Sequence, residues 1–258
     1  MTRHLDLALI GGTGLYKFPG LTRVKRHAVD TPYGMPSDSI ATGNVGSRRI
    51  AFLARHGESH TIPPHRVDYR ANVWALHHLG ARRVVGVNAV GGIRDDMGPR
   101  VLAVPDQVID YTHGRLTSYC DVAGAEVHHI DFSEPYSARL RTELLIAARH
   151  AGLAVVDGGC YGATQGPRLE TRAEIARMRR DGCDLVGMTG MPEAALAREL
   201  GLEYACLALV ANWAAGCDPA AGSGQAAQIR MPEILANLDA ATVEVPRIIA
   251  ALLAALPA

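Results

Sequence analysis

The sequence predicts an α/β fold in which buried strands alternate with amphipathic helices. Short apolar runs end at glycine-rich turns, as strands of a covered sheet do. Longer segments between these runs repeat apolar residues every three or four positions, which is the period of a helix. The chain of 258 residues shows no internal repeat and no linker-like stretch. We therefore expect a single domain spanning residues 1–258.

The first elements along the chain are mostly strands. Residues 5–10 form an apolar run, which predicts a strand that ends in a glycine turn. Strands of a hairpin are expected near residues 37–43 and 49–53. Residues 66–79 carry apolar side chains at helical spacing, which predicts a helix that ends at Gly80.

The middle of the chain alternates strand and helix signals. A short strand is expected at residues 84–88, and residues 101–110 contain a further strand whose proline places it at an edge or a bulge. Residues 112–133 have little periodicity, so we expect a long loop that carries function or subunit contacts. Amphipathic patterns predict helices at residues 135–150 and 171–181.

The C-terminal third continues the alternation. A helix is expected at residues 192–200, and residues 204–211 form a nearly continuous apolar strand, as expected when both faces of a sheet are covered. A Gly/Ala-rich loop is expected at residues 217–228. Residues 232–256 predict a helix that kinks or breaks at Pro246.

Composition excludes several classes of partner. Lys plus Arg and Asp plus Glu both total 26, so the chain lacks the basic excess that binds a nucleic acid backbone. The N-terminus has no signal-peptide core, and no apolar run reaches the length of a membrane helix. Five scattered cysteines without a CxxC pair indicate reduced thiols. We expect a cytoplasmic protein that binds neither nucleic acid nor membrane.

Four segments that end strands carry groups suited to an anion. These segments are residues 11–14, 54–60, 88–92 and 187–193. Their glycines allow backbone N–H groups to approach an anion, and their Thr, Arg and His side chains add donors. Because ligands collect at the carboxyl ends of strands in open α/β sheets, the four segments together predict one pocket that binds phosphate.

A metal site is the alternative at the second of these segments, since His56, His60 and His65 lie close in sequence. Gly57 and the prolines that follow would break any helix that presented His56 and His60 on one face. We therefore expect no metal.

Five motifs then occur in the order of one family: GGTGL from residue 11, RHG from 55, NAVGG from 88, QGPRLET from 165 and GMTGMPE from 187. Over residues 7–238 the sequence resembles the trimeric purine nucleoside and methylthioadenosine phosphorylases, and it looks most like the bacterial S-methyl-5'-thioinosine phosphorylases. The resemblance implies a central mixed, partly barrel-like sheet flanked by helices. It also implies a homotrimer, inorganic phosphate as co-substrate and no cofactor.

The resemblance also implies a role for each matching residue. Phosphate would lie among Thr13, Arg55, His56, Asn88, Ala89 and Thr189. Met188 would contact the ribose, and the base would meet Glu170 and the segment Asn212, Trp213 and Ala214, in which Trp213 either shapes the purine pocket or packs beneath it. His129 would close the sugar pocket of a neighbouring subunit. His56 and Asn212 would act most directly in catalysis.

Two departures from the pattern of this family, one at the base and one at the 5' end of the sugar, indicate which nucleoside is bound. Relatives that take 6-aminopurines carry carboxylates where this chain has Asn212 and Ala214. Asn212 can donate to a 6-oxo group, and Glu170 can accept from the N1–H that 6-oxopurines have. Met231 stands where relatives for 5'-hydroxyl nucleosides carry histidine, and its thioether suits a 5'-methylthio group better than a hydroxyl. The alternative is that Met231 is only helix core.

The expected reaction converts S-methyl-5'-thioinosine and phosphate to hypoxanthine and 5-methylthioribose 1-phosphate. Phosphate would supply the nucleophile and the negative charge beside a ribosyl cation-like state, while Asn212 stabilises the departing purine. Phosphorolysis of inosine or guanosine, or of methylthioadenosine, remains an alternative. A non-catalytic nucleotide-binding module is the alternative from a different class. A dinucleotide-binding oxidoreductase is disfavoured because the first glycine turn lacks the third glycine of that fingerprint.

Overall fold

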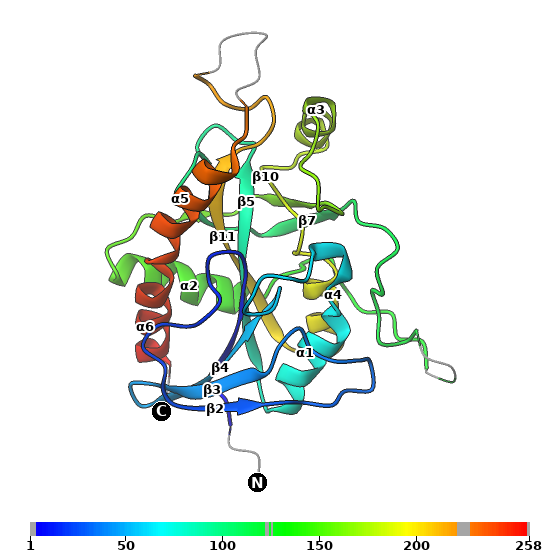
Figure 1. The fold of residues 1–258 in the computed structure, drawn as a ribbon, viewed down its shortest axis with the longest axis vertical. Coiled ribbons are helices and arrows are strands. Elements are labelled where there is room, and N and C mark those ends of the chain that lie inside the picture. The colour runs from blue at the N-terminus through cyan, green and yellow to red at the C-terminus, as the bar shows by residue number, and fades with distance from the viewer. Residues whose placement is uncertain (1–3, 122–123, 125, 221–227, 257–258) are drawn as a thin grey trace.

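The computed structural model describes residues 4–121, 124, 126–220 and 228–256. Its strands form an 11-stranded mixed sheet with helices on both faces (Figure 1). Helices α1 (Tyr69–His78) and α4 (Glu193–Glu199) pack on one face, and α2 (Ala138–His150), α5 (Met231–Thr242) and α6 (Val245–Ala255) pack on the other. The prediction of an α/β fold with a central mixed sheet flanked by helices is confirmed.

The remaining elements in the described residues are the strands, a short α-helix and one 3-10 turn. They are β1 (Leu7–Gly11), β2 (Thr22–His27), β3 (Ile40–Val45), β4 (Arg48–Ala54), η1 (Pro64–Arg66), β5 (Arg83–Gly92), β6 (Leu102–Val104), β7 (Gln107–Asp110), β8 (Val156–Asp157), β9 (Cys160–Ala163), α3 (Arg172–Arg180), β10 (Leu185–Gly187) and β11 (Glu203–Trp213).

The sheet divides at β5, and this division creates the space for a site. One edge of β5 pairs with β11 along its whole length. On the opposite edge, residues 84–86 pair with β1, and residues 91 and 92 pair with β10, which runs antiparallel to β5. Residues 87–90 have no strand partner on that edge among the described pairings. The ends of β1 and β10 therefore point toward each other across an opening in the sheet.

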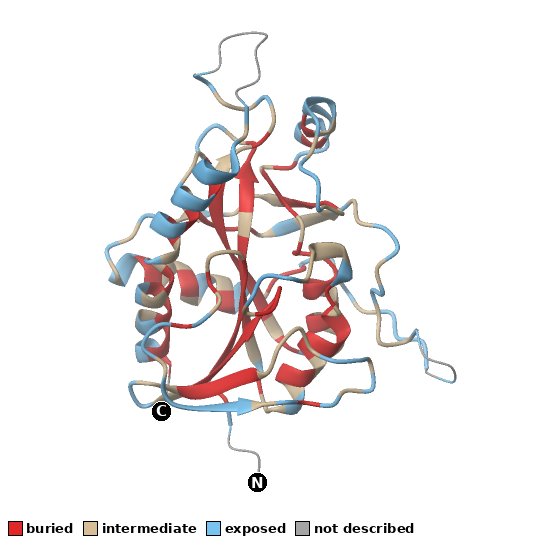
Figure 2. Cartoon of the chain, in the orientation of Figure 1, coloured by how far each residue is buried: buried red, intermediate tan, exposed pale blue. Residues whose placement is uncertain are grey.

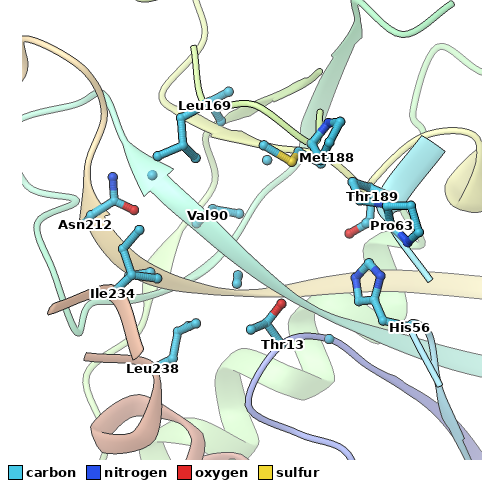
Figure 3. A pocket seen from close by; sticks show the side chains of 18 of the residues that line it. Thr13, His56, Pro63, Val90, Leu169, Met188, Thr189, Asn212, Ile234 and Leu238 are labelled. Carbon is cyan, nitrogen blue, oxygen red and sulfur yellow. The ribbon is translucent and has the colours of Figure 1, made fainter. Parts of the chain in front are cut away.

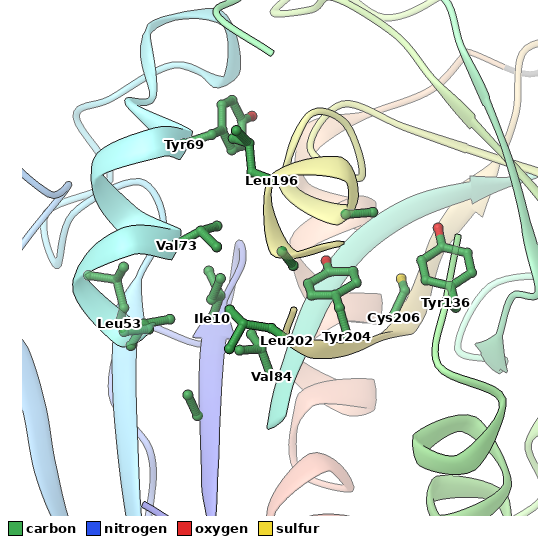
Figure 4. Close-up of a cluster of buried hydrophobic side chains, with 14 of the residues drawn as sticks. Ile10, Leu53, Tyr69, Val73, Val84, Tyr136, Leu196, Leu202, Tyr204 and Cys206 are labelled. Atoms are coloured by element: carbon green, nitrogen blue, oxygen red, sulfur yellow. The ribbon is translucent and has the colours of Figure 1, made fainter. Parts of the chain in front are cut away.

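Alternate side chains of β11 point to opposite faces of the sheet and contribute to the hydrophobic core on each face. Tyr204, Cys206 and Ala208 pack toward α1 and α4, whereas Ala205 and Leu207 pack toward α2, α5 and α6. All five side chains are almost completely buried. Figure 2 shows the buried sheet between its helical layers, and Figure 4 shows the α1 side of this core. A strand buried on both faces holds its terminal residues firmly, which matters because β11 ends at the site.

Most predicted elements are present, with different ends. The predicted helix break is confirmed, since α5 ends at Thr242 and Pro246 lies in the first turn of α6. The proline at position 105 separates β6 from β7. The predicted loop at 112–133 contains no helix or strand in its described residues. Residues 221–227 of the predicted loop at 217–228 lie outside the described residues.

Three strands were not predicted, and two were predicted too short. β2, β8 and β9 were missed: the residues of β2 are mostly exposed, and β8 and β9 are very short. β5 continues through Gly91 and Gly92, which the sequence suggested was a turn, because β11 and β10 pair with these residues. No helix in the described part of the chain is long and apolar enough to cross a membrane.

Candidate active site

A cavity of about 550 Å³ lies at the opening beside β5 (Figure 3). Segments that follow β1, β4 and β10 meet there, together with the end of β11 and one side of α5. The cavity is lined by ten of the predicted site residues: Thr13, Arg55, His56, Ala89, Glu170, Met188, Thr189, Asn212, Ala214 and Met231. The four strand-end segments proposed from the sequence therefore share one pocket.

The turn after β1 brings Thr13 close to β5. The Leu15 N–H donates to the Gly12 carbonyl at 3.0 Å, and Gly14 has a φ of +86°, which suits glycine in the third position of this turn. A Cβ on Gly12 would lie only 2.6 Å from the Val87 carbonyl oxygen of β5. Glycine at position 12 thus permits the close approach that places the Thr13 hydroxyl in the cavity.

Arg55 is held by a buried carboxylate, which the sequence analysis did not anticipate. Its Nε and Nη2 each donate to Glu193 at 2.8 Å, and both side chains are 0% exposed. Nη1 donates to the Val87 carbonyl at 3.0 Å. Burial alone lowers the pKa of Arg55, but the charge and hydrogen bonds of Glu193 outweigh it and raise the pKa above its ordinary value. Arg55 is therefore a permanent cation.

The expected role of Arg55 as a donor to phosphate needs to be narrowed. Its forked face is occupied by Glu193, and Nη2 also donates to Asn88 Oδ1 at 3.4 Å. Counting the five N–H groups of a guanidinium, these bonds leave one N–H on Nη1 for a ligand at the cavity. Arg55 can contribute positive charge and a single donor there.

Asn88 lies beneath the cavity and does not line it. Its Nδ2 donates to Thr189 Oγ1 at 2.9 Å, while its Oδ1 accepts from Arg55. The prediction that Asn88 contacts phosphate directly is not supported, because both ends of its amide are occupied by protein. The bond to Thr189 has a useful consequence: the Thr189 oxygen accepts from Asn88, so its own O–H is free to donate into the cavity.

His56 is neutral and has a fixed tautomer. Its Nδ1 lies 2.8 Å from the Ile62 carbonyl oxygen, so Nδ1 must carry a proton and donate it. Burial, reinforced by the charge of Arg55, lowers the pKa of His56 to about 4. Nε2 is therefore an acceptor at neutral pH, whereas the sequence analysis expected His56 to act as a second donor to phosphate.

A β-bulge directs Asn212 into the cavity. In β11, Val210 pairs with Val90 but Asn212 pairs with the next residue, Gly91, so Ala211 is the extra residue. Side chains of consecutive strand residues normally point to opposite faces. Here Ala211 and Asn212 both line the cavity because the bulge rotates the strand between them. Figure 3 shows Asn212 across Val90 from Thr189.

Glu170 lines the cavity from the segment that follows β9. The Thr164 hydroxyl donates to Glu170 Oε1 at 2.6 Å and thereby orients the carboxylate. Met188 follows β10 and lines the cavity next to Thr189 (Figure 3). The Asn212 amide thus stands at one end of the cavity, and Thr189 and His56 stand at the other (Figure 3).

Apolar side chains form the walls between these ends. Val90, Leu169, Ile234 and Leu238 line the cavity, the last two from α5 (Figure 3). Met231, the first residue of α5, lines the cavity and is 57% exposed. The alternative that Met231 is buried helix core is therefore wrong, and the thioether lies at the mouth of the site.

Besides Asn88, two predicted residues lie outside the cavity. Trp213 does not line it. A Cβ on Gly98 would lie 2.8 Å from Trp213 Cζ2, so the indole packs against Gly98. His129 is exposed and does not line the cavity of its own chain. Among the described residues, no cluster of three or more His, Cys, Asp or Glu side chains could hold a metal ion.

The comparisons with known proteins agree with this arrangement. The family model described as the phosphorylase superfamily matches residues 6–254. The chain belongs to the phosphorylase superfamily. The resemblance inferred from the five motifs is therefore confirmed.

Relatives within the phosphorylase superfamily cover nearly the whole chain. A probable S-methyl-5'-thioinosine phosphorylase of Xanthomonas campestris is 62% identical over 248 residues, which are 96% of this chain and 97% of the relative. A 6-oxopurine nucleoside phosphorylase of Pyrococcus furiosus is 46% identical over 217 residues, 81% of this chain and 80% of the relative. These relatives are nucleoside phosphorylases, as the sequence analysis expected.

Solved structures of the superfamily share the fold. Methylthioadenosine phosphorylase from Schistosoma mansoni in complex with adenine has a TM-score of 0.90 and 32% sequence identity. The superposition covers 97% of this chain and 91% of that chain.

Two residues of the site in this phosphorylase were missed from the sequence. Glu193 is separated from Arg55 by 138 positions, and no local pattern links the two. A usable signal was present: Glu193 precedes the apolar run Ala194, Ala195 and Leu196, and a carboxylate in such a setting is seldom buried without a cation. Ile62 was missed because its carbonyl, not its side chain, fixes the tautomer of His56.

Proposed function

We propose that this protein cleaves S-methyl-5'-thioinosine with inorganic phosphate, giving hypoxanthine and 5-methylthioribose 1-phosphate. The observation that carries the proposal is the polarity of the cavity. The Thr189 hydroxyl and His56 lie at one end and the Asn212 amide lies at the other, and the Glu170 carboxylate and the exposed Met231 thioether also line the cavity. The names of the relatives support the same substrate class.

Phosphate would bind where the sheet is open. The Thr13 and Thr189 hydroxyls and the free N–H of Arg55 Nη1 would donate to its oxygens. The Ala89 amide would add a donor, because it faces the same edge of β5 as the Val87 carbonyl two residues earlier. Since His56 Nε2 is an acceptor, it would accept a hydrogen bond from the hydroxyl of monohydrogen phosphate.

The base would leave toward Asn212 and Glu170. As the bond from C1' to N9 breaks, its electron pair goes to the purine and a phosphate oxygen forms the new bond to C1'. The Asn212 amide would stabilise the charge that develops on the purine, and Glu170 would accept from N1–H. The proton gained by hypoxanthine balances the proton that phosphate loses on becoming an ester. No metal or organic cofactor enters this reaction.

Phosphorolysis of inosine is the second candidate, because one relative is a 6-oxopurine nucleoside phosphorylase. Met231 favours the methylthio substrate, since a 5'-hydroxyl left without a partner against apolar side chains costs about 1–3 kcal/mol. The test compares phosphate-dependent turnover of methylthioinosine, inosine and methylthioadenosine. Faster cleavage of methylthioadenosine than of methylthioinosine would overturn the assignment, and cleavage independent of phosphate would overturn the reaction type.

The proposal extends to assembly and location. The resemblance to trimeric enzymes supports a homotrimer in which the exposed His129 reaches a neighbouring cavity, and sedimentation analysis of the purified chain tests it. The five free cysteines support a reducing, cytoplasmic location. The partners proposed are the nucleoside and phosphate, without nucleic acid or membrane.

A further inference from the structure

Part of the cavity wall is formed by two segments that leave neighbouring strands. β9 and β10 are parallel partners that end together at Ala163 and Gly187. The chain after β9 carries Glu170, and the chain after β10 carries Met188 and Thr189. One further backbone bond joins them, from the Thr164 N–H to the Gly187 carbonyl at 2.8 Å. Beyond that bond, the sheet ladder no longer sets their spacing.

Beyond the last backbone bond, the guanidinium of Arg115 links the two segments by hydrogen bonds. On the β9 side, Nη2 donates to the Thr164 and Gln165 carbonyls at 3.2 and 2.9 Å. On the β10 side, Nη1 donates to the Met188 and Met191 carbonyls at 2.8 and 2.6 Å. Each of these segments supplies wall residues to the cavity, and a single planar group binds both.

The remaining contacts fix Arg115 itself. Nε donates to Gln165 Oε1 at 3.1 Å, so every N–H of the guanidinium has a partner. Nη1 also lies 3.3 Å from the Tyr69 hydroxyl on α1. Arg115 does not line the cavity. A side chain that uses all its donors on backbone and scaffold sets geometry and does not bind the ligand.

We propose that Arg115 is a positioning residue that holds the wall bearing Glu170 and the wall bearing Met188 and Thr189 at the spacing required by the nucleoside and phosphate. The proposal rests on the proposed function of the cavity. Its strength comes from the planar fork of arginine, which presents parallel donors to carbonyls on both sides. Lysine keeps the charge but gathers its donors on one nitrogen, so it cannot span the same carbonyls.

The test compares Arg115→Met and Arg115→Lys with a matched control, Arg141→Met. Arg141 also donates to backbone carbonyls, those of Pro105 and Val104 at 2.9 and 3.2 Å, and to Asp157, but it lies away from the cavity. For each variant we would measure the melting temperature, kcat, and the KM values for methylthioinosine and for phosphate. Each assay is run the same number of degrees below the melting temperature of that variant.

We expect Arg115→Met to lose about 100-fold in kcat/KM, the scale reported for displacements near 1 Å, with kcat itself reduced. Arg115→Lys should fall between Arg115→Met and wild type. Arg141→Met should melt at a lower temperature with wild-type kinetics. If Arg115→Met fails to fold, Arg115→Lys carries the test.

Wild-type kinetics in Arg115→Lys, or equal losses of kcat in Arg115→Met and Arg141→Met, would overturn the inference. An inactive wild-type protein would instead overturn the proposed function, so the two failures are distinguishable.

Discussion

Replacing Glu193 with Gln should destabilise this protein strongly, although it removes no more than one charge. Gln keeps the shape of Glu193 and can still accept a hydrogen bond, so packing changes little. The Arg55 guanidinium would be left as a buried cation without a counter-charge, since both side chains are 0% exposed. The Tyr204 hydroxyl, which donates to Glu193 Oε1 at 2.7 Å, would lose a charged acceptor as well.

The size of the effect follows from burial. Removing one partner of a buried ion pair costs about 3–5 kcal/mol, because the remaining charge has lost its compensation. For a domain of this size, each kcal/mol lowers the melting temperature by about 2–4 °C, so the shift should be roughly 6–20 °C. The double variant Arg55→Met with Glu193→Leu should recover much of this loss, because it buries no charge.

Thermal unfolding followed by circular dichroism measures the shift, with Arg168→Gln as the control. Arg168 forms an ion pair with Glu174 at the same 2.7 to 2.8 Å range, but it is 68% exposed. Exposed ion pairs are screened by water, so the melting temperature of this variant should equal that of wild type. If Glu193→Gln had the same melting temperature as Arg168→Gln, the claim that Arg55 depends on Glu193 for its charge balance would be refuted.

Three further changes test the site. Asn212→Asp should shift the ratio of kcat/KM values from methylthioinosine toward methylthioadenosine by tenfold or more, about the value of one hydrogen bond to a charged group; an unchanged ratio would remove Asn212 from base selection. Met231→His should raise turnover of inosine relative to methylthioinosine by about 5- to 150-fold, corresponding to about 1–3 kcal/mol; a substrate profile like that of wild type would return Met231 to a packing role. The pKa of His56 is about 4 in the folded protein and 6.5 in the unfolded chain. As the pH falls, the unfolded chain therefore binds a proton at this group before the folded protein does. The contribution of His56 to the free energy of unfolding is complete above pH 6.5 and is lost as the pH falls toward 4. Denaturant unfolding between pH 7 and 4 should therefore show a shallower loss in His56→Gln than in wild type, and parallel curves would contradict the fixed neutral tautomer.

Much of the fold was predictable because local patterns encode it. Helical periodicity located α1, α2, α3 and α4, and Pro246 located the break between α5 and α6. Strand ends were less predictable, since pairing partners decide them. Gly91 and Gly92 are poor strand formers, yet they extend β5 because β10 and β11 pair with them from both edges.

The site shows the same limit. Thr13, His56 and Thr189 could be placed from their motifs, because each follows a strand whose end could be recognised. The role of Asn88 could not, because its amide is directed by Arg55 and Thr189, which come from distant parts of the chain. The bulge at Ala211 was also invisible in the sequence, since an apolar residue there fits an ordinary buried strand equally well.

The opening beside β5 separates two kinds of chemistry on one scaffold. At the anion end, the Val87 carbonyl and the Ala89 amide belong to the main chain, and substitution of these residues' side chains would not remove them. In the proposed purine site, selection would depend on the side chains of Glu170 and Asn212, which both line the cavity. Substitutions at Glu170 or Asn212 would therefore change which base is selected, while the main-chain groups at the proposed phosphate site remain in place. The preference for one nucleoside over another could therefore change without any change in the proposed reaction of phosphate with C1' of the sugar.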